Sequence, residues 1–307
     1  MGALHVASAP LAVTTAGHGG GRALGALVLG GIFLGCSPIL VRLSSIGPIA
    51  TAFWRLGFAL LPLGALFAGG IRTGDTGRLP ASRSDHLVAA APGLFLAGDL
   101  ATWHISLHMT SVTNSTLLAN MAPIFVTLAS WLFLRQRISR AFVAGLVLSI
   151  AGVVILNGDT FRTAGDSHLR GDGVALGAAC FYAGYFIVLS RARRLFSTSV
   201  VMLWSTSAAA ACMVPMALVF EPIFVPRLLG GWLILIALGW IVHAGGQGLI
   251  TFALAWLPPT FSSLTLLIQP VVAAVLARIV LGEPLGLSQI AGGAIVIGGI
   301  MLARRTT

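Results

Sequence analysis

Residues 231–256 read GWLILIALGWIVHAGGQGLITFALAW and contain no Asp, Glu, Lys or Arg. A helix needs about 20 apolar residues to cross the hydrocarbon core of a bilayer, so this stretch is long enough to span a membrane. Comparable apolar segments recur along the chain at 22–43, 48–70, 86–107, 111–134, 140–157, 172–190, 198–220, 260–281 and 286–303. The sequence therefore predicts an all-α integral membrane protein with ten transmembrane helices.

The composition of the chain excludes an ordinary soluble domain. Of its 307 residues, 57% are apolar and only 8% are charged, whereas a soluble domain carries about 25% charged residues. The net charge of +10 would also suit a nucleic-acid-binding protein. However, the arginines lie in short breaks between apolar segments, which is the pattern of membrane topology. We expect a lipid bilayer around the protein and no nucleic-acid partner.

The distribution of arginine predicts the orientation. All 18 basic residues are Arg, which indicates a GC-rich bacterial genome, and twelve of them fall on the side of the N-terminus. By the positive-inside rule, both termini face the cytoplasm of a bacterial inner (plasma) membrane. No basic residue precedes Arg22, so a cleaved signal peptide is not expected. Residues 1–21 are predicted to form a disordered tail, and residues 304–307 a short C-terminal tail.

The chain contains an internal repeat. At a constant offset of 147, identical residues coincide in three pairs of segments, among them Thr113 with Thr260, Pro123 with Pro270, Gly145 with Gly292 and Gly152 with Gly299. We predict a first repeat over 22–157, a linker over 158–171 and a second repeat over 172–303. Because each repeat has five spans, an odd number, the second repeat enters the membrane inverted, as in many carriers.

Three motifs point to a family: Pro48-x4-Phe53-Trp54-Arg55, Val188-Leu189-Ser190-Arg191 and Leu281-Gly282-Glu283-Pro284. Together with the repeat, they resemble the EamA-type transporters of the drug/metabolite transporter superfamily. The resemblance implies ten helices and export of amino acids or other small metabolites, with aromatic-amino-acid exporters as one branch.

The chain departs from the family pattern in two places. Arg135-Gln136 replaces Gly-Glu at the first-half counterpart of Gly282-Glu283. Segment 22–43 contains no acid, and segment 172–190 contains only Asp172, at its first position, so neither has an acid inside the span that could match the first-helix Glu used for proton coupling by the small four-helix exporters of the superfamily.

Asp99 is the one acid well inside a predicted span. Counted at 1.5 Å per residue, Asp99, Arg55 and Asn120 all lie about 10–13 Å below the outer face. A charge at that depth should face a cavity or a partner. Two interpretations stay open: Asp99 and Arg55 contact the substrate, or they form a buried pair that fixes helix packing.

A second polar group is predicted in the other half. Gln247 and Gln269 lie about 13–15 Å from the inner face by the same rise, and His243 shares the helix face of Gln247. We expect these three side chains to line a binding pocket. The alternative is that they form interhelical hydrogen bonds.

Aromatic and proline residues complete the candidate site. Tyr182 and Tyr185 lie in the middle of a span, unlike interfacial aromatic residues, and could stack on a ring-bearing substrate. Trp103 shares the face of Asp99 and either binds substrate or anchors the helix at the interface. Pro123 and Pro270 are predicted to kink equivalent helices, as gate elements or as static curvature.

The sequence favours a carrier over an enzyme or a channel. It contains no intramembrane catalytic motif and no repeated filter, and His104 and His108 lack a third ligand that would make a metal site. We predict a monomeric secondary transporter without cofactor or metal that exports amino acids, including aromatic ones, or related small metabolites. The substrate is expected to be zwitterionic; the alternatives are nucleosides, polyamines and cationic drugs.

Overall fold

The structure is a computed structural model and describes residues 18–74, 76–107, 109–110, 112–158, 169–221, 223–282 and 285–305. Within these ranges every regular element is a helix. The predicted tail over 1–17, most of the predicted linker, and Glu283 and Pro284 of the last motif lie outside the described residues. The last four residues of the predicted N-terminal tail are helical, because α1 begins at His18.

The helices of the first half are α1 (His18–Gly35), α2 (Ser37–Arg42), α3 (Pro48–Thr73), α4 (Arg83–Leu107), α5 (Val112–Ala119), α6 (Ala122–Leu134) and α7 (Arg140–Leu156). Those of the second half are α9 (Leu169–Leu195), α10 (Thr198–Phe220), α11 (Leu229–Ala237), η1 (Leu238–Gln247), α12 (Gly248–Ala253), α13 (Pro259–Thr265), α14 (Ile268–Leu281) and α15 (Leu287–Arg304).

Eight helical stretches of the described chain are long and apolar enough to cross a membrane: Gly20–Arg42, Pro48–Thr73, Leu117–Leu134, Leu169–Leu195, Thr198–Phe220, Leu229–Ala253, Pro259–Leu281 and Leu287–Arg304. The other two predicted segments hold α4 and α7. α7 is shorter, at 17 residues, and α4 has 25 residues, among them the polar Asp99 and His86. The count of ten spans stays a prediction.

Three of the predicted spans are interrupted, each close to a proline. Proline cannot donate a hydrogen bond to the carbonyl four residues earlier, and its ring collides with that turn. Accordingly α5 ends at Ala119, four residues before Pro123, and α13 ends at Thr265, five before Pro270. The break between α1 and α2 precedes Pro38 in the same way.

The eighth predicted span contains a π-helix. Its middle third, η1, runs over ten residues between α11 and α12. A π-helix closes i→i+5 hydrogen bonds, so it is wider than an α-helix and turns its side chains to a different angle. Three glycines, Gly239, Gly245 and Gly246, lie within η1, where they permit neighbouring helices to approach.

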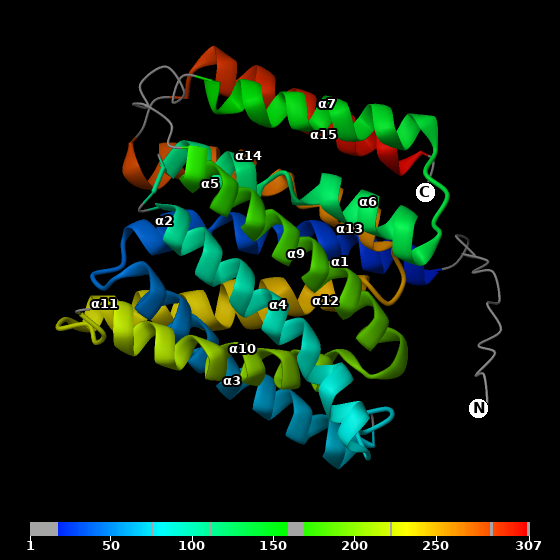
Figure 1. The fold of residues 1–307 in the computed structure, drawn as a ribbon, viewed down its shortest axis with the longest axis vertical. Coiled ribbons are helices and arrows are strands. Elements are labelled where there is room, and N and C mark those ends of the chain that lie inside the picture. The colour runs from blue at the N-terminus through cyan, green and yellow to red at the C-terminus, as the bar shows by residue number, and fades with distance from the viewer. Residues whose placement is uncertain are drawn as a thin grey trace.

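The two halves make matching contacts. α1 packs against η1 and α12, and its counterpart α9 packs against α4; α1 also contacts α13 and α14, as α9 contacts α5 and α6. Two counterpart pairs contact each other directly: α3 with α10, and α7 with α15. Exchanging the halves therefore leaves this set of contacts unchanged. Figure 1 shows the bundle, with α7 and α15 side by side at one edge.

Glycines bring α7 and α15 together. A Cβ atom on Gly145 would lie 2.6 Å from the carbonyl oxygen of Gly299, and one on Gly152 would lie 2.8 Å from that of Gly292. Since higher numbers in α7 meet lower numbers in α15, the two helices are antiparallel. The contacts are also reciprocal, because Gly292 and Gly299 are the repeat counterparts of Gly145 and Gly152.

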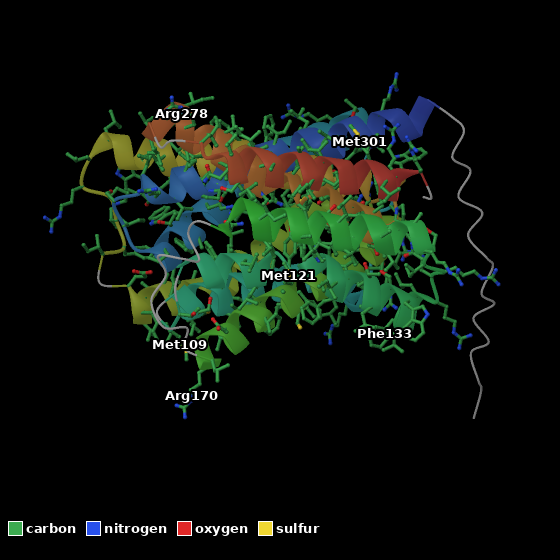
Figure 2. The ribbon with its side chains drawn as sticks, turned by 90° about the horizontal axis from the view of Figure 1, so that it is seen from above. Met109, Met121, Phe133, Arg170, Arg278 and Met301 are labelled. Atoms are coloured by element: carbon green, nitrogen blue, oxygen red, sulfur yellow. The ribbon has the colours of Figure 1, made fainter. Side chains whose placement is uncertain are left out.

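The ends of the bundle differ in the residues they carry. α1 begins and α15 ends at the same end of the bundle (Figure 1). Figure 2 shows Phe133 and Met301 toward that end, and Met109, Arg170 and Arg278 toward the opposite end.

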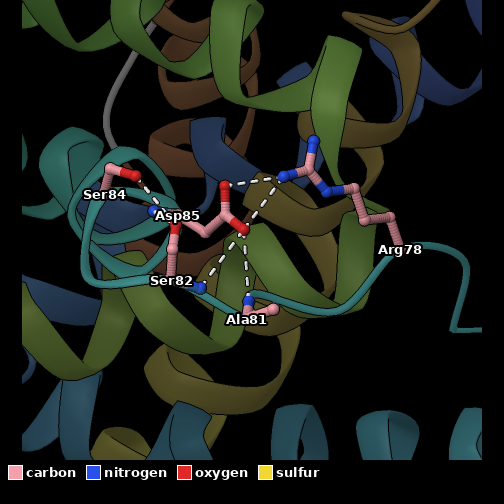
Figure 3. A network of polar contacts seen from close by, with 5 residues as sticks. All are labelled: Arg78, Ala81, Ser82, Ser84 and Asp85. Atoms are coloured by element: carbon pink, nitrogen blue, oxygen red, sulfur yellow. Dashed lines mark hydrogen bonds and ion pairs between the residues drawn. The ribbon is translucent and has the colours of Figure 1, made fainter.

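The connection between α3 and α4 is held by Asp85, in the first turn of α4. Its carboxylate accepts hydrogen bonds from the backbone N–H of Ala81 and Ser82, at 3.2 and 3.4 Å, and pairs with Arg78 at 2.8 Å (Figure 3). The hydrogen bond from Ala81, together with those from Arg78 and Ser82, holds the pKa of this carboxyl below its ordinary value of 3.8. The connection is therefore fixed locally, by charge-assisted hydrogen bonds.

Candidate functional site

A cavity of about 400 Å³ lies between the two halves. Its lining includes eight of the residues singled out from the sequence: Arg55, Asp99, Trp103, Asn120, Tyr182, Gln247, Gln269 and Pro270. They come from α3, α4, α9, η1, α14 and the break between α5 and α6. Members of both polar groups predicted from the sequence, one group in each half, thus border one cavity.

Arg55 and Asp99 face this cavity without bonding to each other. Among the described residues, Arg55 makes one hydrogen bond, from Nη1 to Ser37 Oγ at 3.3 Å, and its buried Nε has no partner. No ion pair or hydrogen bond joins the Asp99 carboxylate to any described residue, although the two charges are close enough to attract each other. Buried charges normally require partners. A carboxyl group and a guanidinium group therefore border the cavity without a bond between them.

The two breaks and the π-helix position the amide side chains. Asn120 lies in the break between α5 and α6, and Gln269 is the second residue of α14, directly after the equivalent break. Gln247 is the last residue of η1, and its amide Nε2 donates to the hydroxyl of Tyr185 at 2.7 Å. The interruptions therefore bring amide groups into the centre of the bundle, where a continuous α-helix would place different residues.

The two tyrosines of α9 have different positions. Tyr182 lines the cavity, next to the amide of Gln269. Tyr185 lies behind it and is 1% exposed, with ring centroids 5.9 Å apart and planes at 24°. Of the pair, Tyr182 borders the cavity, and Tyr185 contacts both Tyr182 and Gln247.

His243 and Pro123 lie outside the lining of the cavity. His243 is 1% exposed, and its Nε2 lies 3.0 Å from Oγ1 of Thr206 on α10. Pro123 is buried near the start of α6. Neither residue therefore borders the cavity, although the sequence placed His243 in it.

Three polar residues of the lining were not found from the sequence: Ser37, Asn157 and Gln289. Ser37 begins α2 after the first break, Asn157 follows α7, and Gln289 lies in the first turn of α15. Their positions beside helix ends were the available signal. Asn157 and Gln289 lie at the end of the bundle opposite to the start of α1, so the cavity extends toward that end (Figure 1).

Polar contacts join helices at the other end. The Nε of Arg193 donates to the carbonyl of Thr251 at 2.9 Å, and Nη1 donates to the carbonyl of Phe196. Gln136 Nε2 donates to Oγ1 of Thr260 at 3.0 Å, which joins the end of α6 to the start of α13. At the end opposite to the one toward which the cavity extends, Gln136 thus joins the two halves, and Arg193 joins α9 to α12 within the second half.

The part of the chain that the structure describes contains no group of three or more His, Cys, Asp or Glu side chains that could hold a metal ion. The side chains of His104 and His108 lie outside that part.

Comparison with known proteins identifies the family. The EamA-like transporter family matches residues 21–158 and again residues 169–305. The chain belongs to the EamA-like transporter family. As a duplicated EamA protein with several apolar helices, it is a multi-pass membrane transporter, surrounded by lipid and acting on a small molecule.

Relatives of this EamA-like transporter are also named transporters. It is 26% identical to an "Uncharacterized transporter" of Archaeoglobus fulgidus, over 91% of this chain and 95% of the relative. It is 28% identical to a "Probable terminal-alkyne amino-acid exporter" of Streptantibioticus cattleyicolor, over 88% of each chain. A solved crystal structure has the same fold, with a TM-score of 0.76 at 20% identity, covering 94% of this chain and 98% of the other.

Proposed function

We propose that this EamA-like transporter is a secondary carrier that exports amino acids, including aromatic ones, or related small metabolites, by alternating access. The observation that carries the proposal is that Arg55 and Asp99 border one cavity and do not pair with each other. The name of the Streptantibioticus cattleyicolor relative, an amino-acid exporter, supports the same substrate class.

A zwitterion satisfies both charges of the cavity. The carboxylate of an amino acid can accept charge-assisted hydrogen bonds from Arg55, including its unpartnered Nε, while the ammonium group donates to Asp99. The side chain of the substrate is then left to Trp103 and Tyr182, whose rings suit an aromatic or a large apolar group. A volume of about 400 Å³ is within the range of small-molecule pockets.

The inverted repeat is part of the proposal. The matching contacts of the halves and the reciprocal, antiparallel packing of α7 on α15 support two units related by a two-fold axis in the membrane plane. In such carriers the site lies between the repeats, and interrupted helices supply part of it. The breaks before Pro123 and Pro270 are the proposed hinges of this movement, through α6 and α14.

The orientation of the protein in the membrane then defines the conformational state of the proposed carrier. With both termini in the cytoplasm of the bacterial inner membrane, the cavity extends toward the outside, and the contacts of Arg193 and Gln136 lie at the cytoplasmic end. We propose a monomer, since the cavity is enclosed by helices of one chain. The conformation is the outward-facing one.

A second substrate class uses Asp99 alone. An acidic side chain that borders the cavity without an ion pair to any described residue also suits polyamines and cationic drugs, whose export would not require Arg55. The two proposals are therefore distinguished by comparing ligands that carry both an ammonium and a carboxylate group with ligands that carry only one of these groups.

The test is counterflow in proteoliposomes. Vesicles loaded with unlabelled phenylalanine should accumulate external labelled phenylalanine transiently, and protein-free vesicles should not. Phenylalaninol, which lacks the carboxylate, and phenylpropionate, which lacks the ammonium group, should each compete at least ten times more weakly than phenylalanine. If none of the amino acids competes while spermidine or a nucleoside does, amino-acid export is excluded. Non-saturating flux without counterflow would indicate a channel.

A further inference from the structure

A second hollow of the molecule lies far from the cavity, where α6 ends. This groove, of about 680 Å³, is lined by Trp131, Leu132, Arg135, Gln136, Arg137 and Ile138. The apolar stretch Leu117–Leu134 finishes directly before the two arginines. We propose that the groove binds the phosphate headgroup of an anionic phospholipid. This proposal is independent of the substrate and of the transport mechanism.

The apolar part of the groove suits acyl chains. Trp131 and Leu132 are each 58% exposed, and the neighbouring Phe133 is 66% exposed and points away from the bundle (Figure 2). An exposed Trp at the end of a spanning helix is typical of the level of the lipid headgroups. The groove therefore crosses the boundary between hydrocarbon and headgroups, with its charged part just beyond the apolar part.

The charges of the groove have no counterion among the residues that the structure describes. Arg135 and Arg137 are exposed and make no ion pair with any residue that the structure describes. No Asp or Glu occurs in the sequence between Asp99 and Asp159, so neither α6, α7 nor their connection supplies a counterion. The complementary ligand is an anion located at the membrane surface, which is the phosphate of a lipid.

The connection that carries these arginines is rigid. The backbone N–H groups of Arg135 and Gln136 both donate to the carbonyl of Ser130, the latter at 3.1 Å. The side chain of Gln136 is fixed to Thr260, and Ser139 Oγ caps α7 by accepting from the N–H of Phe142 at 3.0 Å. A preformed site loses less entropy on binding than a mobile basic loop does.

The experiment compares purified variants in nanodiscs or detergent, with phosphatidylglycerol as the probe and phosphatidylcholine as the neutral control, by native mass spectrometry. The variants are Arg137→Gln and the double variant Arg135→Asn/Arg137→Gln; Asn is chosen because it tolerates the left-handed backbone at position 135. Arg304→Gln/Arg305→Gln, which removes two arginines that do not line this groove, is the matched control.

A basic residue near an anionic surface contributes about 1 kcal/mol, so phosphatidylglycerol retention should fall about five-fold in the single variant and about 25-fold in the double variant. The control and phosphatidylcholine retention should not change. Equal loss in the control pair would mean a general surface-charge effect and would overturn the site. So would retention that is unchanged in both groove variants, or complete displacement of the lipid by inorganic phosphate, which would make free phosphate the ligand.

Discussion

Arg135 and Gly282 occupy equivalent positions in the two halves, and both have a left-handed backbone, with φ of 51° and 70°. Each ends its helix, and each donates its N–H to the carbonyl five residues earlier, that of Ser130 or of Ala277. Glycine adopts this conformation at no steric cost, whereas a residue with a Cβ atom adopts it only with steric strain. One half therefore carries a strained residue where the other carries a relaxed one.

The first prediction follows from this strain. Replacing Arg135 with Gly should stabilise the protein by about 1 kcal/mol, because the new residue accepts the native backbone without strain. Thermal unfolding in a neutral detergent measures the change. The reverse substitution, Gly282→Ala, should destabilise by a similar amount. A lower unfolding temperature for Arg135→Gly would contradict the prediction.

The second prediction concerns the charges of the cavity. Asp99→Asn and Arg55→Gln should each reduce amino-acid affinity about 10- to 100-fold, since each removes a charge-assisted hydrogen bond to the ligand. Half-saturation concentrations in counterflow measure the effect. The double variant should remain as weak as the weaker single variant. Recovery of transport in the double variant would show that the two residues act as a structural pair instead.

The third prediction tests the glycine contact between α7 and α15. A Cβ atom on Gly299 would lie 2.3 Å from Ser149 Oγ and 2.6 Å from the carbonyl of Gly145, so Gly299→Ala should force the helices apart. We expect a loss of about 1–3 kcal/mol. A Cβ atom on the adjacent Gly298 would meet nothing within 4 Å, and Gly298→Ala is therefore the matched control. Equal unfolding temperatures for the two variants would refute the close contact.

The fourth prediction is a dependence on pH. The folded-state pKa of Asp85 lies below 3.8, so its carboxylate stabilises the fold above the unfolded-state pKa, and this contribution is lost as the pH falls through the folded pKa. Asp85→Asn should therefore lower the unfolding temperature at pH 7 and make progressively less difference below about pH 4. A difference between variant and parent that is constant from pH 7 to pH 3 would exclude this role.

The sequence predicted the helical class and the family well, because both depend on patterns that are local or that repeat. Apolar runs mark spanning helices without knowledge of their neighbours, and the offset that joins Pro123 to Pro270 also joins the two helix breaks. The inverted orientation, in contrast, rests on counting spans, and α4 and α7 fall outside the eight stretches that meet the length and hydropathy requirement.

The site was predicted only in part, because depth along a helix does not define direction around it. Counting residues from the ends of the predicted spans placed Asp99 and Gln247 in separate groups, yet both side chains line one cavity. His243 was predicted to line the pocket beside Gln247, but it lies within the π-helix η1 and contacts Thr206 on α10 instead. No hydrophobic pattern distinguishes i→i+5 from i→i+4 hydrogen bonding over ten residues.

The packing of α7 on α15 has a mechanical consequence. Backbone lies directly against backbone at Gly145, Gly152, Gly292 and Gly299, and no flexible side chains separate the helices. Sliding one helix along the other would drive Cα atoms and carbonyls into the opposite chain, because a closely packed contact resists deformation. We therefore expect α7 and α15 to move together as one rigid unit shared by both halves. The helices that surround the cavity would then have to accommodate a cycle of opening and closing.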